Sequence, residues 1–169
     1  MIRSARVTGG LCIVLAASLQ AQTPSAAAHM ESLLDSLVGR WSMTGSVRGR
    51  PATYTLDVTR VLQRRFVELH MVDVARPPAY EARVFIGVDS AGGRYIAHWL
   101  DNTGAAYSIP PATGEARGDS LLLNFPYPDN PFRDTFAHDP RSGTWHFRLE
   151  SADSTGAWHL FAEYQVRRR

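Results

Sequence analysis

Leu37-Val38-Gly39-Arg40-Trp41 is the stretch at which the hydrophobic pattern of this 169-residue chain changes. Before it, apolar residues recur at the spacing of one helical face, at Met30, Leu33, Leu34 and Leu37. Gly39 is well placed to end that helix in a left-handed cap. After Trp41 the period becomes two, which is typical of strands with one buried face. The sequence therefore predicts a short amphipathic helix followed by a β domain.

Alternation of apolar and polar residues continues almost to the last residue. It is clearest over 53–59, 82–88, 145–150 and 158–164, where β-branched and aromatic residues are frequent. In the last of these runs, Trp158, Leu160, Ala162 and Tyr164 are expected on one face. These patterns predict half-buried antiparallel strands, and no later stretch has the pattern of a long amphipathic helix.

The segments between these runs repeat one turn chemistry. Four of them begin with Asp and close with Gly: 89–93, 101–104, 139–143 and 153–156. Aspartate caps nearby backbone N–H groups, and glycine accepts a positive φ, so such loops suit hairpins. Gly118-Asp119 marks a further turn. Prolines also fall between the runs, where they do not interrupt a strand ladder.

Together these signals predict about ten strands, near 40–48, 51–61, 65–74, 79–89, 93–101, 104–109, 119–125, 132–138, 143–151 and 157–166. Regularly spaced hairpins favour an up-and-down meander, and closure of the meander removes exposed edges. We therefore expect an all-β fold, a single antiparallel β-barrel with a short N-terminal helix across one end. A barrel of this size can hold side chains and one small ligand.

The N-terminal residues predict an export signal. Two arginines precede a short apolar run at 11–19, and small residues follow it. We expect a signal peptide over 1–21, a flexible leader over 22–29 and the barrel domain over 30–169. A cut after Ala28, a retained anchor and a disordered tail are the alternatives. Export predicts a periplasmic or secreted bacterial protein, with no integral membrane segment after cleavage.

Charge and cysteine content exclude several kinds of partner. The chain has 18 basic residues, all of them arginine, against 16 acidic ones. Loss of Arg3 and Arg6 with the signal would leave no net charge, and the basic residues form no stripe of the kind that binds nucleic acid. The single cysteine, Cys12, lies in the apolar run, so a cleaved chain could form neither a disulfide nor a thiolate metal site.

The order of several short motifs resembles a known family. The chain reads 37–41 (LVGRW), then 86–89 (IGVD), then 99–104 (WLDNTG), and closes with 149–158 and 163–167. In this order they resemble a bacterial family of secreted, calycin-like (lipocalin-like) domains of unknown function. The resemblance spans about residues 33 to 167. It implies a lipocalin-like barrel and supplies no activity or catalytic residues.

The resemblance also implies a closing contact at one end of the barrel. In lipocalins an arginine on the last strand packs across the tryptophan of the first strand. Here Arg167 would lie across Trp41 as a cation–π and capping contact. We interpret this pair as barrel closure, with ligand contact at the barrel mouth as the alternative.

Catalytic groups are weakly indicated. Glu68, His70 and His98 could form a general acid/base cluster or part of a metal site if all three pointed inward. Because strand faces alternate, the opposite face of the same strand, with Val67, Leu69 and Met71, is the preferred core set. We name the three polar residues as weak catalytic candidates only.

The remaining polar residues favour a solvated surface. His146, Arg148 and Glu150 share one face, with His159 and Glu163 opposite, which predicts cross-strand charge pairs on the outside. Haem ligation through one of five histidines (His70, His98, His138, His146 or His159) is a minority interpretation. The sequence has no phosphate loop and no nucleophile elbow, and we predict no cofactor and no metal site.

The expected barrel interior indicates binding more than catalysis. Aromatic residues that could line it are Tyr54, Tyr95, Trp99, Tyr107, Phe125 and Phe147. We expect an exported barrel that binds a small apolar or amphipathic molecule. The alternatives are a calycin-type enzyme with acid/base residues in the cavity, and a structural envelope domain whose core is filled.

Overall fold

A computed structural model describes residues 25–169, so the expected signal peptide over 1–21 lies outside the described residues. A helix, α1 (Ala26–Leu37), precedes ten strands, and a single 3-10 turn, η1 (Ala105–Tyr107), follows the fifth strand. The strands are β1 (Gly39–Val47), β2 (Arg50–Val61), β3 (Phe66–Asp73), β4 (Glu81–Asp89), β5 (Arg94–Asp101), β6 (Ala112–Arg117), β7 (Ser120–Phe125), β8 (Phe132–Asp139), β9 (Thr144–Ala152) and β10 (Trp158–Arg168).

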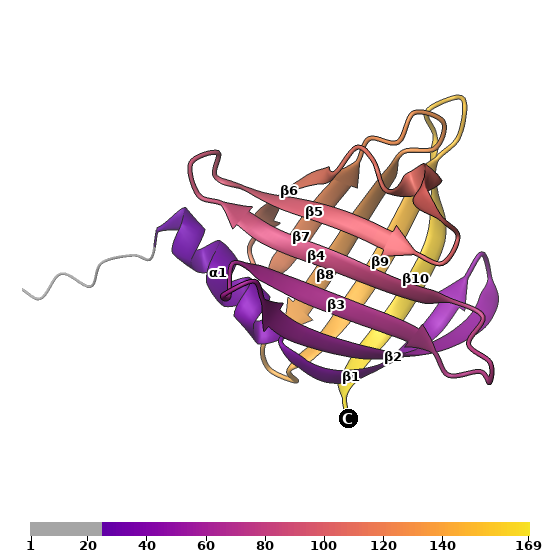
Figure 1. The fold of residues 1–169 in the computed structure, drawn as a ribbon, viewed down its shortest axis with the longest axis horizontal. Coiled ribbons are helices and arrows are strands. Elements are labelled where there is room, and N and C mark those ends of the chain that lie inside the picture. Colours follow the sequence, from indigo (N-terminus) through magenta and orange to yellow (C-terminus); the bar gives the residue numbers. More distant parts are fainter. Residues whose placement is uncertain (1–24) are drawn as a thin grey trace, which may run out of the picture.

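The ten strands form one closed barrel in which every strand pairs antiparallel with its neighbours in the chain (Figure 1). The barrel closes where β1 pairs with β10, from Trp41 opposite Arg168 to Val47 opposite Ala162. Every strand therefore has a partner on both sides, although β5 pairs with β6 only over Tyr95–Ala97. The predicted all-β, up-and-down barrel with a short N-terminal helix is therefore confirmed.

The helix covers one end of the barrel (Figure 1). It begins at Ala26, where the Ser25 hydroxyl accepts a hydrogen bond from the Ala28 amide at 3.2 Å. Residues 26–29 are therefore helical, although they fall in the expected leader. The predicted stripe is the buried face of the helix: Met30, Leu33, Leu34 and Leu37 are at most 5% exposed. We call this end of the molecule the closed end.

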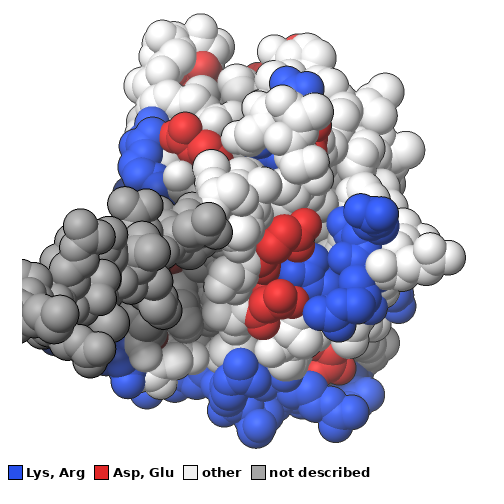
Figure 2. All heavy atoms as spheres, turned by 90° about the vertical axis from the view of Figure 1, so that its left-hand side faces the viewer, with Lys and Arg blue, Asp and Glu red and all other residues white. Residues whose placement is uncertain are grey.

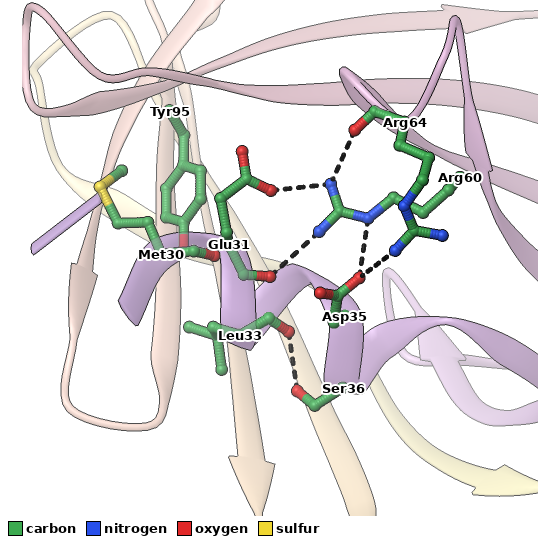
Figure 3. A network of polar contacts seen from close by, with 8 residues as sticks. All are labelled: Met30, Glu31, Leu33, Asp35, Ser36, Arg60, Arg64 and Tyr95. Atoms are coloured by element: carbon green, nitrogen blue, oxygen red, sulfur yellow. Dashed lines mark hydrogen bonds and ion pairs between the residues drawn. The ribbon is translucent and has the colours of Figure 1, made fainter. Parts of the chain in front are cut away.

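Arg60 of β2 fastens the helix to the barrel (Figure 3). Its side chain is only 7% exposed, and its guanidinium lies 2.8 Å from Glu31 Oε2 and 2.9 Å from Asp35 Oδ1. It also donates to the Glu31 carbonyl oxygen at 3.0 Å. In Figure 2, which faces this end, acidic and basic side chains lie beside one another near the middle of the surface.

The sequence predicted Gly39 as the left-handed cap of the helix. This prediction was wrong, although Gly39 does follow the helix. Val38 is the cap residue, with ordinary extended dihedrals, and Gly39 is the first residue of β1 with φ +150°. A Cβ at Gly39 would lie 2.5 Å from the guanidinium of Arg168. Glycine is needed here for its backbone conformation and for the close approach of this side chain.

Arg168, and not the predicted Arg167, closes the barrel over Trp41. The Arg168 guanidinium lies 4.3 Å from the centre of the indole ring, and Arg168 pairs with Trp41 across the strands. Trp41 is fully buried, and its Nε1 donates to the Leu37 carbonyl oxygen at 2.8 Å. Arg167 pairs with Ser42 and is exposed on the outer face, because neighbouring residues of a strand point to opposite sides.

One predicted strand was wrong. Residues 104–109 hold η1 and part of a loop, and the strand lies later, at β6. Small residues carry the alternation in β6, so its hydrophobic signal is weak. Its Gly114 packs so tightly on β7 that a Cβ would lie 2.1 Å from the Leu122 carbonyl oxygen. Here the fold requires small side chains, which sequence periodicity does not detect.

The last strand also departs from the simple pattern. A register shift, of the kind that a β-bulge produces, falls between Leu160 and Ala162. Such a shift changes which side of the barrel the following residues face. Ala162 and Tyr164 are buried as expected, but Trp158 and Leu160 are 37% and 44% exposed. The expectation that all four share one face was therefore wrong.

The aspartate turns have the predicted chemistry. Asp89, Asp101, Asp139 and Asp153 each accept a hydrogen bond from a backbone amide two or three residues later, at 2.8–3.0 Å. The turns at Asp89, Asp139 and Asp153 join hairpins, whereas Asp101 begins the longer connection to β6. The loops opposite α1, including this connection, surround what we call the open end (Figure 1).

Candidate functional site

The interior of the barrel contains a cavity of about 480 Å³, with apolar and aromatic side chains for most of its lining. Exposed loop residues at the open end, among them Arg48, Thr103 and Tyr107, belong to the same lining, so the cavity opens there. The volume is within the range of small-molecule sites, roughly 300–1,000 Å³. The core at the closed end is filled instead by residues such as Leu34 of α1, Ile86 and Trp145, which are at most 1% exposed.

All but one of the predicted ligand-binding aromatics line this cavity: Tyr54, Trp99, Tyr107, Phe125 and Phe147. Tyr95 is the exception. It is fully buried beneath the helix, and its hydroxyl donates to the Met30 carbonyl oxygen at 3.0 Å (Figure 3). Tyr95 and Trp99 share a strand face, as predicted, but Tyr95 lies four residues earlier in β5 and so closer to the closed end.

A hydrogen-bonded group lies on the cavity wall at the open end. The Tyr80 hydroxyl donates to Asp101 Oδ2 at 2.9 Å and accepts from Trp99 Nε1 at 3.1 Å. Burial, followed by the charge of Asp101, raises the pKa of Tyr80 well above its ordinary value. Tyr80 therefore stays neutral at physiological pH, and each of these three polar groups already has a partner within the protein.

Asp134 is the polar residue that the sequence interpretation missed. It lies on β8, lines the cavity and is 2% exposed, the only charged residue type in the buried core among the described residues. Its Oδ1 has no hydrogen-bond partner among the described residues. Burial raises the pKa of Asp134 well above its usual range. Alternation with Phe132 and Phe136 places Asp134 on the inward face, and this pattern could have identified it.

Asp134 also acts on two tyrosines of the cavity. Burial first, and the negative charge of Asp134 second, raise the pKa of Tyr127 to about 12. The pKa of Tyr164 is also raised, mainly by burial and by its neighbour Tyr54, with a smaller contribution from Asp134. These hydroxyls are therefore neutral near pH 7, and Asp134 is the only carboxyl group among the three side chains.

The three weak catalytic candidates do not enter the cavity. Glu68 pairs with Arg83 on the outer surface, and His70 Nε2 lies 2.8 Å from Glu81 Oε1. His98 is exposed. The inward cluster considered from the sequence is contradicted, because Val67, Leu69 and Met71 occupy the inner face of β3 with at most 6% exposure.

The other histidines are also accounted for outside the cavity. His138 stacks on Trp145 at 4.7 Å between ring centres, and His159 Nε2 lies 2.7 Å from Asp153 Oδ2. His146 pairs with Glu163 at 2.9 Å in the charged outer face that the sequence predicted, although His159 does not join that face. Over residues 25–169, no histidine lines the cavity and no group of three potential ligands could hold a metal ion.

Comparison with known proteins does not assign the chain. No model of a protein family matches it, and no curated protein sequence is significantly similar. Within the described part of the chain, none of the helical structure is long and apolar enough to cross a membrane.

Proposed function

We propose that this chain is an exported bacterial protein of the calycin-like type, which binds a small apolar or amphipathic molecule inside its barrel. One observation carries the proposal: a cavity of about 480 Å³ that is lined by aromatic and aliphatic side chains and reaches the open end. Transfer of an apolar molecule from water into such a space is favourable by about 25 cal/mol for each Å² of apolar surface that is buried. Export and a periplasmic or secreted location rest on the signal-like sequence over 1–21.

The cavity supports binding over the two alternatives. A structural domain with a filled core would leave no space among Tyr54, Leu69 and Phe147, which all line the cavity. A calycin-type enzyme built on Glu68 and His70 would need these side chains inside, where the structure has apolar residues. We therefore favour binding without catalysis.

The test is a calorimetric titration with phenylnaphthylamine, a neutral apolar probe. Leu69 and His70 are neighbours on β3, and they offer a matched pair of variants. Leu69 is 3% exposed and lines the cavity, whereas the His70 side chain is 29% exposed on the outer face. Leu69→Trp adds volume to the interior, and His70→Trp adds the same group to the surface.

We expect saturable binding with one probe per chain in the wild type and in His70→Trp, and weaker binding by about tenfold or more in Leu69→Trp. Circular dichroism checks that both variants keep the barrel. Absence of saturable binding in the wild type, with no copurified small molecule by mass spectrometry, would overturn the proposal. Equal loss in both variants would place the probe outside the cavity.

A further inference from the structure

The cavity joins an unpaired carboxyl group to aromatic walls. Asp134 is 2% exposed, and its Oδ1 has no hydrogen-bond partner among the described residues. Across the strands it pairs with Leu123 on one side and Leu149 on the other, both apolar. A buried polar atom without a partner is unfavourable, because it has lost its hydrogen bonds to water. An isolated buried acid in a binding cavity therefore points to a ligand that supplies the missing partner.

The nearby cations of the chain are engaged elsewhere. Arg133, the neighbour of Asp134 on β8, points outward, where its Nε donates to Glu150 at 2.7 Å and its guanidinium lies 4.5 Å from the Trp158 ring. Arg48, at the cavity mouth, lies 5.0 Å from the ring centre of Phe161. Burial is the cause of the raised pKa of Asp134. The described residues thus provide this carboxyl group with no counter-ion.

The aromatic walls suit a cation as well as an apolar body. Phe125, Tyr127 and Phe132 form a chain of ring contacts with centres 5.6 and 6.4 Å apart along the open half of the cavity. Phe136 and Phe147 line the cavity too, with ring centres 4.1 Å apart and ring planes tilted by 30°. An ammonium group within about 6 Å of an aromatic face is attracted to it, and the attraction is stronger when water is excluded.

We propose that the ligand of the cavity is an organic ammonium with an apolar body, whose N–H group donates to the Asp134 carboxylate while its body lies among the aromatic rings. The inference rests on the proposed binding function and specifies the chemical class of the ligand. A neutral apolar molecule would leave the Asp134 oxygen without a partner, and an anion would be repelled by the ionised carboxylate.

Binding of the ammonium ion requires Asp134 to be ionised. Its proton leaves to solvent as the ammonium enters, so affinity rises with pH until the carboxyl group of the empty protein has ionised. The titratable groups that interact with it are the Tyr127 and Tyr164 hydroxyls, which stay protonated. The Asp101 carboxyl group lines the same cavity at the open end and accepts from Tyr80. The experiment is therefore made at about pH 8, where an alkyl ammonium with a pKa of about 10 is still charged.

The test compares two probes with one body, naphthylethylammonium and naphthylethanol, by calorimetric titration. The wild type should bind the ammonium about tenfold or more tightly than the alcohol. Asp134→Asn should lose this preference while its affinity for the alcohol changes little. Asp119→Asn, an exposed turn variant with the same chemical change, should keep the wild-type preference.

Each outcome separates this inference from the function on which it rests. If phenylnaphthylamine and naphthylethanol bind but the wild type shows no preference for the ammonium, the inference is wrong and the proposed function stands. A preference that survives in Asp134→Asn would also overturn the inference, because the charge would then be recognised elsewhere. If no probe binds, both proposals fail.

Discussion

At the scale of single residues, the contact between Trp41 and Arg168 shows how strand alternation decides a role. The resemblance implied Arg167, but Tyr164 and Val166 are buried, so the next residue on that face is Arg168. Arg168 then lies over the indole ring and donates to the Val38 carbonyl oxygen at 3.4 Å. If the alternation of buried residues on β10 is continued to the end of the chain, it selects Arg168.

This pair gives a prediction with an internal control. Arg168→Ala removes the guanidinium from the Trp41 ring and should lower the free energy of unfolding by about 0.5–1 kcal/mol, the usual value of an exposed cation–π contact. Arg167→Ala removes the same charge from the outer face and should change it by less than about 0.5 kcal/mol. Urea denaturation of both variants measures the difference. A larger loss of unfolding free energy in Arg167→Ala than in Arg168→Ala would contradict this assignment and favour Arg167, as the resemblance implied.

The buried carboxyl group of Asp134 leads to a second prediction, which concerns how the stability of the protein depends on pH. Its native pKa lies above the usual value of 3.8, so between the two values the native state holds a proton that the unfolded state has released. The free energy of unfolding therefore falls as pH rises above about 4, until the native carboxyl group has also ionised. Asp134→Asn removes this dependence, because an amide does not titrate.

We expect Asp134→Asn to be more stable than the wild type near pH 7, by about 1–3 kcal/mol, with the difference shrinking toward pH 4. Chemical denaturation across this range measures both curves, and Asp119→Asn serves as the exposed control. A variant that is less stable than the wild type at neutral pH would mean that Asp134 has a structural partner. The carboxyl group of Asp134 would then no longer indicate a ligand.

At the scale of elements, the helix depends on the barrel for its place. An isolated helix of 12 residues is only marginally stable in water. Packing of its apolar face and polar contacts with the barrel must therefore stabilise α1. Arg60 provides ties to Glu31 and Asp35, and its own side chain is 7% exposed. Arg64 also approaches Asp35, at 3.6 Å, but its side chain is 73% exposed.

Arg60→Ala should therefore loosen α1. We expect a loss of about 1–3 kcal/mol, because hydrogen bonds from a largely buried guanidinium are broken, and faster hydrogen exchange of the α1 amides. Arg64→Ala should cost less than about 1 kcal/mol, since exposed ion pairs contribute little. Exchange measured by NMR on both variants makes the comparison. Equal protection of α1 in wild type and Arg60→Ala would show that apolar packing alone holds the helix.

Element prediction from the sequence succeeded where side chains alternate in size and polarity, and failed where they do not. The strands that carry Trp145 and Phe147, or Val84 and Ile86, are close to their predicted positions. β6 was missed because its inner face is built from alanine and glycine. The bulge in β10 was missed because a register shift leaves no mark in the sequence, so the exposure of Leu160 could not be anticipated.

At the scale of the whole molecule, the two ends of the barrel differ. The closed end is filled beneath α1 and fixed by Trp41 and Arg60, whereas the open end leads into the cavity (Figure 1). The aromatic lining could be predicted, since alternation sorts inside from outside. Which aromatics would meet the cavity could not, because that depends on how deep α1 and Tyr95 fill the barrel. Strand alternation could have placed Asp134 on the inner face of β8. That its Oδ1 has no hydrogen-bond partner could be seen only in the packed structure.

We propose that a small apolar molecule is bound inside the barrel. Intermolecular nuclear Overhauser effects between phenylnaphthylamine and the methyl groups of the protein test it most directly. Binding inside the barrel should give contacts to Leu69, Met71 and Leu149, which line the cavity. Contacts confined to exposed residues, such as Leu62 at 67% and Leu100 at 44% exposure, would contradict it.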